Sequence, residues 1–326
     1  MTKSDQLIEV LDTRAKRRND RRAFFKTALG AAAVGATLAI PLDAAAQAVP
    51  SDADILNFAL NLEYLEAQFY AYAANGTGLA ANLLTGSGTQ GSVNGGRRVE
   101  FTDPVVRQYA REIAADEVAH VAFLRNALGS SAVAQPTIDI GVGPNTAFSN
   151  AARAAGLIGA GATFDPYAND ENFLLGAFIF EDVGVTAYKG ASPLITNTTY
   201  IDAAAGILAV EAFHAGLIRN ALYAKGIGTS TLRAASESIS NARDTLDGPA
   251  DLDQGVATQT VPYVNANGTS VNVQVSNIAP TDANGIAFSR TPAQVLNIVY
   301  LTAGTSASSG GFFPNGVNGT LRTTAA

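Results

Sequence analysis

The sequence predicts a mainly α protein, a bundle of four helices with one long crossover connection, followed by a C-terminal extension. Apolar residues recur at helical spacing in four segments between residues 51 and 224. Glycine-rich or proline-containing stretches, which end helices, separate these segments. About 40 residues lie between the second and third segments, more than the roughly 2 to 8 that join neighbouring bundle helices. A link of this length can cross the bundle from one helix pair to the other.

The four helices are expected at residues 51–74, 103–128, roughly 171–189 and roughly 199–224. Ser51 begins the first helix, with Asp54 three residues on as a weak capping box. Asp103 begins the second, because Pro104 is tolerated at the first helical position. Between these two helices, residues 75–101 carry seven glycines and are expected to form a long surface loop.

The C-terminal extension differs in character from the bundle. Residues 261–275 alternate valine with polar residues around Asn267 and Gly268, which predicts a β-hairpin. A short helix is expected next, since Thr291 can cap it and Pro292 can occupy its first turn. Glycine-rich loops complete the extension, which either covers the bundle or makes a contact between copies in a homo-oligomer.

Composition limits the chemistry that the chain can carry. With 47% hydrophobic and 15% charged residues among 326, the chain is expected to fold. It has no cysteine, which excludes disulfides, thiolate metal sites and cysteine nucleophiles. Any metal must therefore be bound by oxygen atoms or by imidazole nitrogens.

The first 48 residues have the layout of an export signal. A basic stretch that includes Arg21 and Arg22 precedes an uncharged, alanine-rich run at residues 28–40. The arginine pair lies in a DRRAFFK segment that resembles the twin-arginine export pattern, and small residues before Val49 suit a cleavage site. An uncleaved membrane anchor is the alternative, although thirteen uncharged residues fall short of the roughly 20 needed to span a membrane.

Cleavage would leave a strongly acidic mature protein. It removes eight basic and five acidic residues from totals of 21 and 28, leaving 13 Lys and Arg against 23 Asp and Glu. We therefore expect a periplasmic or extracellular protein, exported by the twin-arginine route, with no nucleic-acid partner and no stable membrane insertion after maturation. The expected parts are a signal peptide at residues 1–48, the bundle at 49–244 and an extension packed on the bundle at 245–326.

Both histidines of the chain stand three residues after a glutamate. The motifs are Glu117-Val-Ala-His120 and Glu211-Ala-Phe-His214. Residues three apart share one face of a helix, so each motif presents a carboxylate and an imidazole together. Arg-Asn-Ala-Leu follows both histidines at the same offset, which indicates that these two helices repeat one another.

The other two helices show a second correspondence. Glu63 is followed seven residues later by Tyr70, and Glu181 likewise by Tyr188. The bundle is therefore interpreted as two related helix pairs, each supplying one glutamate and one Glu-x-x-His motif.

Helical phase places these four glutamates inside the bundle. Positions three, four and seven residues from each of them are largely apolar, as Leu56, Leu60 and Ala67 are around Glu63. Ionised carboxylates in a dry interior repel one another and each cost on the order of several kcal/mol, so they must bind protons or cations. Two divalent ions would balance the four negative charges, with neutral imidazoles completing the set. The candidate metal ligands are Glu63, Glu117, His120, Glu181, Glu211 and His214.

Three segments are similar to a known family: residues 61–70 (NLEYLEAQFY), 287–292 (AFSRTP) and 310–314 (GGFFP). Through them the chain resembles the ferritin-like di-metal carboxylate superfamily, and more closely its exported, desiccation-related bacterial branch. The likeness covers most of residues 51–320. It implies a ferritin-like four-helix bundle with a di-iron or di-manganese centre.

The resemblance also implies a role for each ligand: Glu63 and Glu181 are the single ligands from their helices, Glu117 and Glu211 bridge the ions, and His120 and His214 bind one ion each. Glu66 departs from the pattern by adding a carboxylate one turn from Glu63. Either Glu63 or Glu66 is then the primary ligand from the first helix.

Four further residues are candidates for supporting contacts, and Glu66 is one of them. Tyr70 and Tyr188 either hydrogen-bond ligand carboxylates or only pack in the core. Asp116 either orients a histidine or lies on the exposed polar face. The histidines themselves are alternatively buried, hydrogen-bonded residues or the remains of a disused metal site. Arg219 lies near the expected end of a helix, where charge preferences explain it without a functional role.

Two functions of different classes follow. The first is an enzyme whose di-iron or di-manganese centre reacts with dioxygen or hydrogen peroxide, as an oxidase or as a peroxide-removing activity. The second is a non-catalytic stress-related or desiccation-related protein whose metal site stabilises the bundle. A ferritin-type storage cage ranks third, behind these two functions, because the long loops and the tail would encumber shell packing.

Overall fold

The computed structural model describes residues 49–324, and the chain from Pro50 onward forms one compact unit. The predicted signal peptide, residues 1–48, lies outside the described residues.

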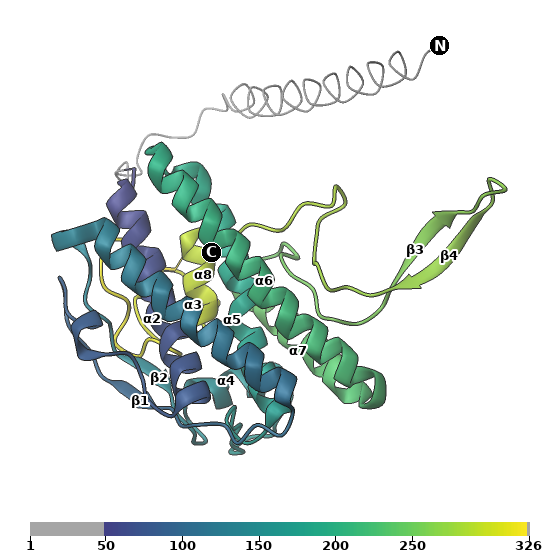
Figure 1. The fold of residues 1–326 in the computed structure, drawn as a ribbon, viewed down its shortest axis with the longest axis horizontal. Coiled ribbons are helices and arrows are strands. Elements are labelled where there is room, and N and C mark those ends of the chain that lie inside the picture. Colours follow the sequence, from purple (N-terminus) through teal and green to yellow (C-terminus); the bar gives the residue numbers. More distant parts are fainter. Residues whose placement is uncertain (1–48, 325–326) are drawn as a thin grey trace, which may run out of the picture. The chain divides into compact units, whose positions relative to one another are not determined.

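The fold is mainly α, as predicted, and its centre is a bundle of four long helices (Figure 1). In chain order these are α2 (Asp52–Asn75), α3 (Pro104–Leu128), α5 (Asp170–Ala191) and α6 (Thr198–Gly228). α2 packs chiefly against α3, and α5 chiefly against α6. Contacts of α2 with α5 and of α3 with α6 join the two helix pairs.

Each of the four helices begins at a side-chain cap. The Ser51 hydroxyl accepts from the Asp54 amide while the Asp54 carboxylate accepts from the Ser51 amide, which confirms the capping box. Asp103 accepts from two first-turn amides of α3, and Asn169 and Asn197 cap α5 and α6 in a similar way. Because the caps set where each helix starts, they also set the register at which the inward side chains meet.

The link between α3 and α5 carries structure that the sequence did not predict. It contains β2 (Ile138–Ile140), which pairs in parallel with β1 (Val93–Gly95) from the loop after α2. It also contains α4 (Ala147–Ala154), whose Phe148 packs on Phe69 of α2. Elements this short leave too few residues for a periodic pattern to stand out. Single 3₁₀ turns lie at Ala81–Leu83, Gly129–Ser131 and Ser192–Leu194.

The prediction that the fourth helix ends before Gly226 is wrong. α6 continues past this glycine, and a further helix, α7 (Ser230–Asp247), follows it. Gly226 lies inside α6 and against Arg233, whose Cγ would be only 2.5 Å from a Cβ at this position. The close approach of this side chain, and not a helix end, explains the glycine. α7 has apolar residues at helical spacing, including Leu232 and Ile239, but its serines also favour caps and turns, which obscured the helix.

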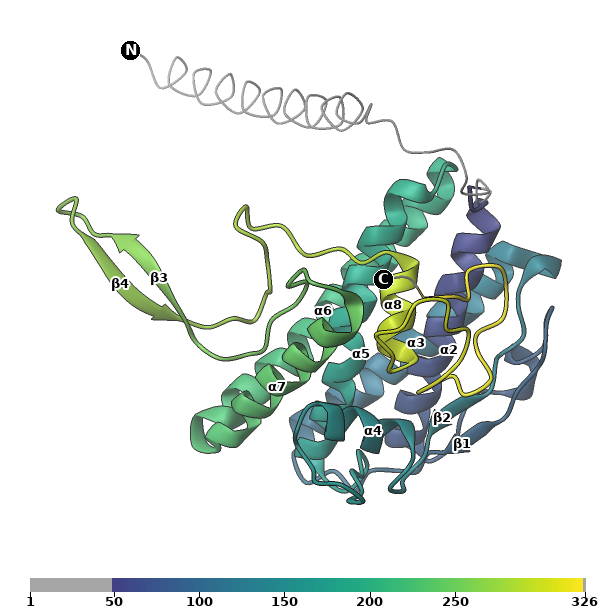
Figure 2. The same cartoon turned by 180° about the vertical axis from the view of Figure 1, so that it is seen from behind.

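The extension contains the predicted hairpin and the predicted short helix, at β3 (Gln259–Val264), β4 (Ser270–Val275) and α8 (Pro292–Val299). β3 and β4 pair antiparallel, and the hairpin stands apart from the helices in both views (Figure 1 and Figure 2). Its side chains are mostly exposed, Tyr263 and Val264 among them. α8 begins at the capping box of Thr291 and Gln294 and packs on α5 and α7.

Buried arginine and aspartate side chains tie the extension to the bundle. Arg219 of α6 is fully buried and donates to Asp182 of α5 at 2.7 Å and to four backbone carbonyl oxygens of the extension. Arg290 of the extension donates to Thr186 of α5 at 3.0 Å and is itself held by Asp253 at 2.6 Å. The explanation of Arg219 by a helix end is therefore wrong, since α6 continues beyond it and the guanidinium holds the extension in place.

In the described part of the chain, α6 is the one helix long and apolar enough to cross a membrane. The core helix of a soluble protein passes the same test, so the finding is weak. α6 packs on α5 and turns two buried polar residues, Glu211 and His214, inward.

We expect Arg219→Met to lower the free energy of unfolding by about 3 to 5 kcal/mol, because buried Asp182 loses a charged partner and four carbonyls lose a donor. Urea unfolding followed by circular dichroism measures the change. Arg111→Met, at an exposed position of α3, is the matched control and should change stability by less than about 0.5 kcal/mol. Equal losses in the two variants would contradict a structural role for Arg219.

Candidate metal centre

The structure brings all six candidate ligands together in the middle of the bundle. They come from all four helices: Glu63 from α2, Glu117 and His120 from α3, Glu181 from α5, and Glu211 and His214 from α6. The exposed fraction of these residues is between 0 and 8%. The glutamates therefore face inward, as their positions in the apolar stripes require.

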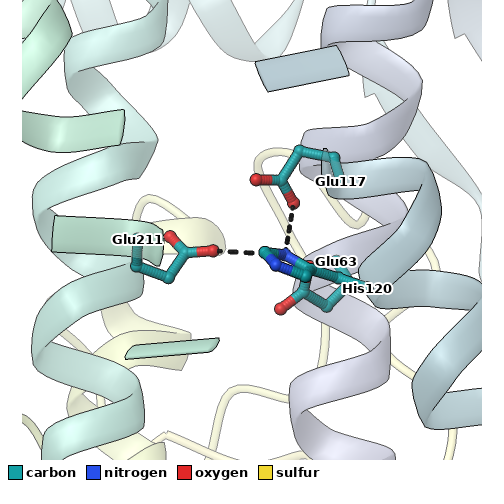
Figure 3. Close-up of side chains that lie close together, drawn as sticks. All are labelled: Glu63, Glu117, His120 and Glu211. Carbon is teal, nitrogen blue, oxygen red and sulfur yellow. Dashed lines mark hydrogen bonds and ion pairs between the residues drawn. The ribbon is translucent and has the colours of Figure 1, made fainter. Parts of the chain in front are cut away.

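His120 faces carboxylates from three helices (Figure 3). Its Nδ1 lies 3.2 Å from Oε2 of Glu63, 3.6 Å from Oε2 of Glu117 and 3.7 Å from Oε1 of Glu211. Figure 3 shows Glu211 reaching toward the imidazole from the opposite side of the bundle.

His214 occupies the matching position in the other half. Its Nδ1 lies 3.0 Å from Oε1 of Glu117 and 3.7 Å from Oε2 of Glu181. Glu117 thus turns one carboxylate oxygen toward each histidine. The two imidazole rings lie 6.1 Å apart between centroids. The position of Glu117 between the two histidines is the one expected of a carboxylate that bridges two ions.

The two tyrosines hydrogen-bond the glutamates of the opposite helix pair. The Tyr70 hydroxyl donates to Oε1 of Glu181, and the Tyr188 hydroxyl donates to Oε1 of Glu63. Of the two roles considered for these tyrosines, the structure therefore has the hydrogen-bonding one. Because each half makes the same contact on the other, the two helix pairs are related as the sequence repeat predicts.

Asp116 is half exposed and also contacts a histidine. Its side chain is 44% exposed, and its Oδ2 accepts from Nε2 of His214 at 3.2 Å. Carboxylates placed in this way fix the orientation and the tautomer of a metal-binding imidazole. Both roles considered for Asp116 thus apply to one side chain.

Glu66 adds a fifth buried carboxylate, and the glycine at the equivalent position of the other helix pair makes room for Glu211. Glu66 is 5% exposed, and the repeat aligns it with Gly184, three residues after Glu181. A Cβ on Gly184 would lie 2.2 Å from Oε2 of Glu211 and 3.5 Å from Oε1 of Glu66. The signal for Gly184 in the sequence is the repeat, which places a glycine in α5 at the position equivalent to Glu66 in α2.

Burial changes the acidity of most of the cluster. It raises the pKa of Glu66, Glu117 and Glu211 well above the ordinary value, and neighbouring carboxylates add to the effect. Burial also raises the pKa of Glu181 to about 8. Burial acts in the same direction on Glu63, but the hydrogen bond and charge of His120 outweigh it, so the pKa of Glu63 is lowered.

The two histidines respond oppositely to their surroundings. Burial lowers the pKa of His214, which favours the neutral imidazole that binds metals. Burial also acts to lower the pKa of His120, but the hydrogen bond and charge of Glu63 outweigh it and raise the pKa. In the metal-free protein, bound protons therefore offset the repulsion between the carboxylates of the cluster.

The ligand atoms fit a pair of metal ions. Several buried atoms have no hydrogen-bond partner among the described residues, namely both oxygens of Glu117, both oxygens of Glu211, Oε2 of Glu181 and Nδ1 of His214. Buried polar atoms are rarely left unpaired, so their convergence indicates a missing partner of positive charge. Two groups have ligand atoms within 4.8 Å of one another: Glu63, Glu117, His120 and Glu211, and Glu181, Glu211 and His214. The cluster can therefore hold metal.

A bundle of two helix pairs joined by a long crossover, with glutamates and two histidines in its interior, defines the ferritin-like class of proteins. A family model described as a ferritin-like domain matches residues 51–224, and the chain belongs to this family.

Two curated relatives cover most of the chain. This chain is 31% identical over 254 residues to the desiccation-related protein PCC13-62 of Craterostigma plantagineum, and the aligned region covers 76% of each chain. It is 28% identical over 279 residues to the ferritin-like catalase Nec2 of Nesocodon mauritianus, covering 83% of this chain and 85% of the relative. The resemblance to the desiccation-related branch of the ferritin-like superfamily is thereby confirmed.

The raised pKa values predict how the metal-free protein responds to pH. The carboxyl of Glu181 has an ordinary pKa of 4.5 and a folded-state pKa of about 8, so the folded protein holds this proton more tightly than the unfolded chain. This stabilisation is complete below pH 4.5 and is lost as pH rises through about 8. Glu66, Glu117 and Glu211 act in the same direction.

We therefore expect the melting temperature of the chelator-treated protein to fall between about pH 5 and pH 8, and Mn²⁺ to remove most of that fall. Differential scanning calorimetry with and without the ion checks this. A melting temperature that stays level or rises over this range in the metal-free protein would contradict the buried, protonated cluster.

We expect Gly184→Ala to reduce metal binding at least about tenfold, because its methyl group would displace the carboxylate of Glu211. Gly216→Ala on α6 is the matched control, since nothing lies within 4 Å of a Cβ at that position. Metal content after dialysis measures the effect. Equal metal content in the two variants would show that Glu211 is not confined by α5.

Proposed function

We propose that this protein is an exported di-metal protein that removes hydrogen peroxide, converting two molecules of peroxide into two of water and one of dioxygen. The observation that carries the proposal is the set of buried carboxylate and imidazole atoms that lack any hydrogen-bond partner among residues 49–324. The likeness to a relative named a ferritin-like catalase supports peroxide as the substrate.

Iron and manganese are the metals that this ligand set suits. Both bind carboxylate oxygen and imidazole nitrogen, whereas the softer thiolate ligands do not occur in this chain. Two divalent ions balance the charge of four glutamates, and the fifth, Glu66, has a strongly raised pKa that favours its neutral form. A pair of such ions supplies the two electrons that peroxide reduction consumes and peroxide oxidation returns.

The protein itself supplies position and dryness. Tyr70 and Tyr188 fix the rotamers of Glu181 and Glu63 by hydrogen bonds. Apolar residues at helical spacing around each glutamate keep bulk water out, which strengthens every electrostatic interaction inside.

We further propose that the chain acts in the periplasm or outside the cell, after export by the twin-arginine route and removal of residues 1–48. The basic stretch, the alanine-rich run and the small residues before Val49 support this proposal. That route exports folded proteins, which fits a centre loaded with metal before export.

A second candidate function is a stress-related or desiccation-related protein whose metal ions only stabilise the bundle. The 31% identity to a desiccation-related protein favours it. Ion binding at a site shared by four helices would stabilise the folded state whether or not the ions react.

The test is metal analysis and peroxide turnover on one preparation. We expect about two iron or manganese ions per chain and dioxygen evolution from hydrogen peroxide, measured with an oxygen electrode. Glu117→Gln removes the charge that faces both histidines and should abolish turnover and lower metal content. Glu112→Gln, an exposed position on the same helix, should change neither.

The outcomes separate the two candidate functions. Two ions per chain without dioxygen evolution would favour the stabilising role. Fewer than one ion per chain after refolding with excess metal would contradict a di-metal centre altogether.

A further inference from the structure

The internal repeat gives the two halves of the centre equivalent positions, so departures from it can be identified residue by residue. α3 aligns with α6, with Glu117 matching Glu211 and His120 matching His214. The two tyrosine hydrogen bonds described above show the same equivalence between α2 and α5. A contact made in one half is therefore expected in the other wherever the residue types agree.

Asp116 breaks this equivalence. It precedes Glu117 and accepts from Nε2 of His214 at 3.2 Å. The matching position, before Glu211, is Val210, which is half-buried and has no side-chain hydrogen-bonding group. Within residues 49–324, the polar contacts of His120 all run through Nδ1. The carboxylate of Asp116 thus orients the imidazole of His214 through Nε2, whereas Nε2 of His120 has no such contact within residues 49–324.

The hydrogen bond has a defined effect on His214. A carboxylate only accepts, so the imidazole proton lies on Nε2 and the lone pair of Nδ1 points into the cluster. Nδ1 lies 3.0 Å from Glu117 and 3.7 Å from Glu181, among the atoms that would share a cation. The carboxylate also makes Nδ1 more basic, and loss of such a partner typically weakens metal binding about 10- to 100-fold.

Other charges near the centre also lack a counterpart in the repeat, since Gly184 stands at the position equivalent to Glu66, but none of them contacts an imidazole within residues 49–324. After burial, the charges of Glu181 and of Glu63, one glutamate from each half, raise the pKa of Glu66. The charge of Asp116 acts on His120 as well as on His214. In the contacts of the two imidazoles, the difference between the halves is therefore the hydrogen bond to Nε2 of His214.

We propose that the two cation positions of the centre are inequivalent, and that the position at His214 holds its ion more tightly than the position at His120 because Asp116 fixes only His214. The inference rests on the proposed di-metal centre. Asp116 is a positioning residue, since it acts through the imidazole and does not touch the ions.

The experiment is a titration of the chelator-treated protein with Mn²⁺, in which isothermal titration calorimetry measures the heat of binding. The unsubstituted protein should bind two ions in steps whose dissociation constants differ by about 10- to 100-fold. Asp116→Ala should weaken the tighter step by that factor and leave the weaker step unchanged. Asp116→Asn, which keeps a neutral acceptor, should lose less. Glu112→Ala, an exposed acid one turn earlier on α3, is the matched control for charge and should change neither step.

A gain of binding tests the same idea from the other half. Val210→Asp places a carboxylate at the position that matches Asp116 and should tighten the weaker step by about tenfold. His120→Gln leaves one strong position, which Asp116→Ala should then weaken. In the His214→Gln background, Asp116→Ala should have no effect, because the two residues act as a unit. Circular dichroism verifies the fold of each variant.

Failure of this inference differs from failure of the proposed function. If the unsubstituted protein binds fewer than two Mn²⁺ ions, the di-metal centre is overturned together with the inference. If it binds two ions of equal affinity, or if Asp116→Ala matches Glu112→Ala, only the inequivalence is overturned and the centre stands.

Discussion

Five glutamates share the interior of this bundle, and no arginine or lysine is among their hydrogen-bond or ion-pair partners in the described part of the chain. Their mutual repulsion and their loss of hydration must be offset, and a dry interior leaves only protons or bound cations to do so. The apolar stripes that exclude water increase the cost of leaving the charges unbalanced. The fold and the charge state of the cluster are therefore coupled, because the four helices can close around the glutamates only when protons or cations neutralise them.

Other buried carboxylates of this protein are balanced in a different way, by arginine side chains. Asp182 and Asp253 are 3% and 2% exposed, and each pairs with buried arginines, among them Arg219 and Arg290. Such pairs satisfy charge within the chain, and Arg243 of α7, which pairs with both aspartates, links the extension to the bundle. The glutamate cluster, with only two histidines and two tyrosines beside it, is left open to an external positive charge. This contrast argues that the cluster is built for ions and is not another internal salt bridge.

The sequence predicted the bundle and the convergence of the cluster because both depend on helical periodicity, which four long helices display over many turns. Glu63 and Glu117 could be placed inward from their neighbours alone. The sequence did not predict α7, where serines share the buried face with apolar residues, nor the role of Arg219, whose partners are backbone atoms far along the chain. Contacts between distant segments leave no periodic pattern in the sequence. The need for glycine at position 184, where Glu211 of α6 lies against the backbone of α5, could therefore not be predicted either.

The repeat explains how a nearly symmetric scaffold can treat two ions differently. The six candidate ligand residues match between the helix pairs, whereas their surroundings do not, since Glu66 corresponds to Gly184 and Asp116 to Val210. Matched ligands give both positions the same first contacts, and unmatched neighbours then set how firmly each contact is held. Under the proposed function, an ion held firmly would keep the glutamates neutralised and the bundle closed, while a more weakly held partner would leave its ligands freer to rearrange around a small substrate. Stability and reactivity would thus be divided between two positions of one centre, which connects the stabilising and the catalytic candidate functions.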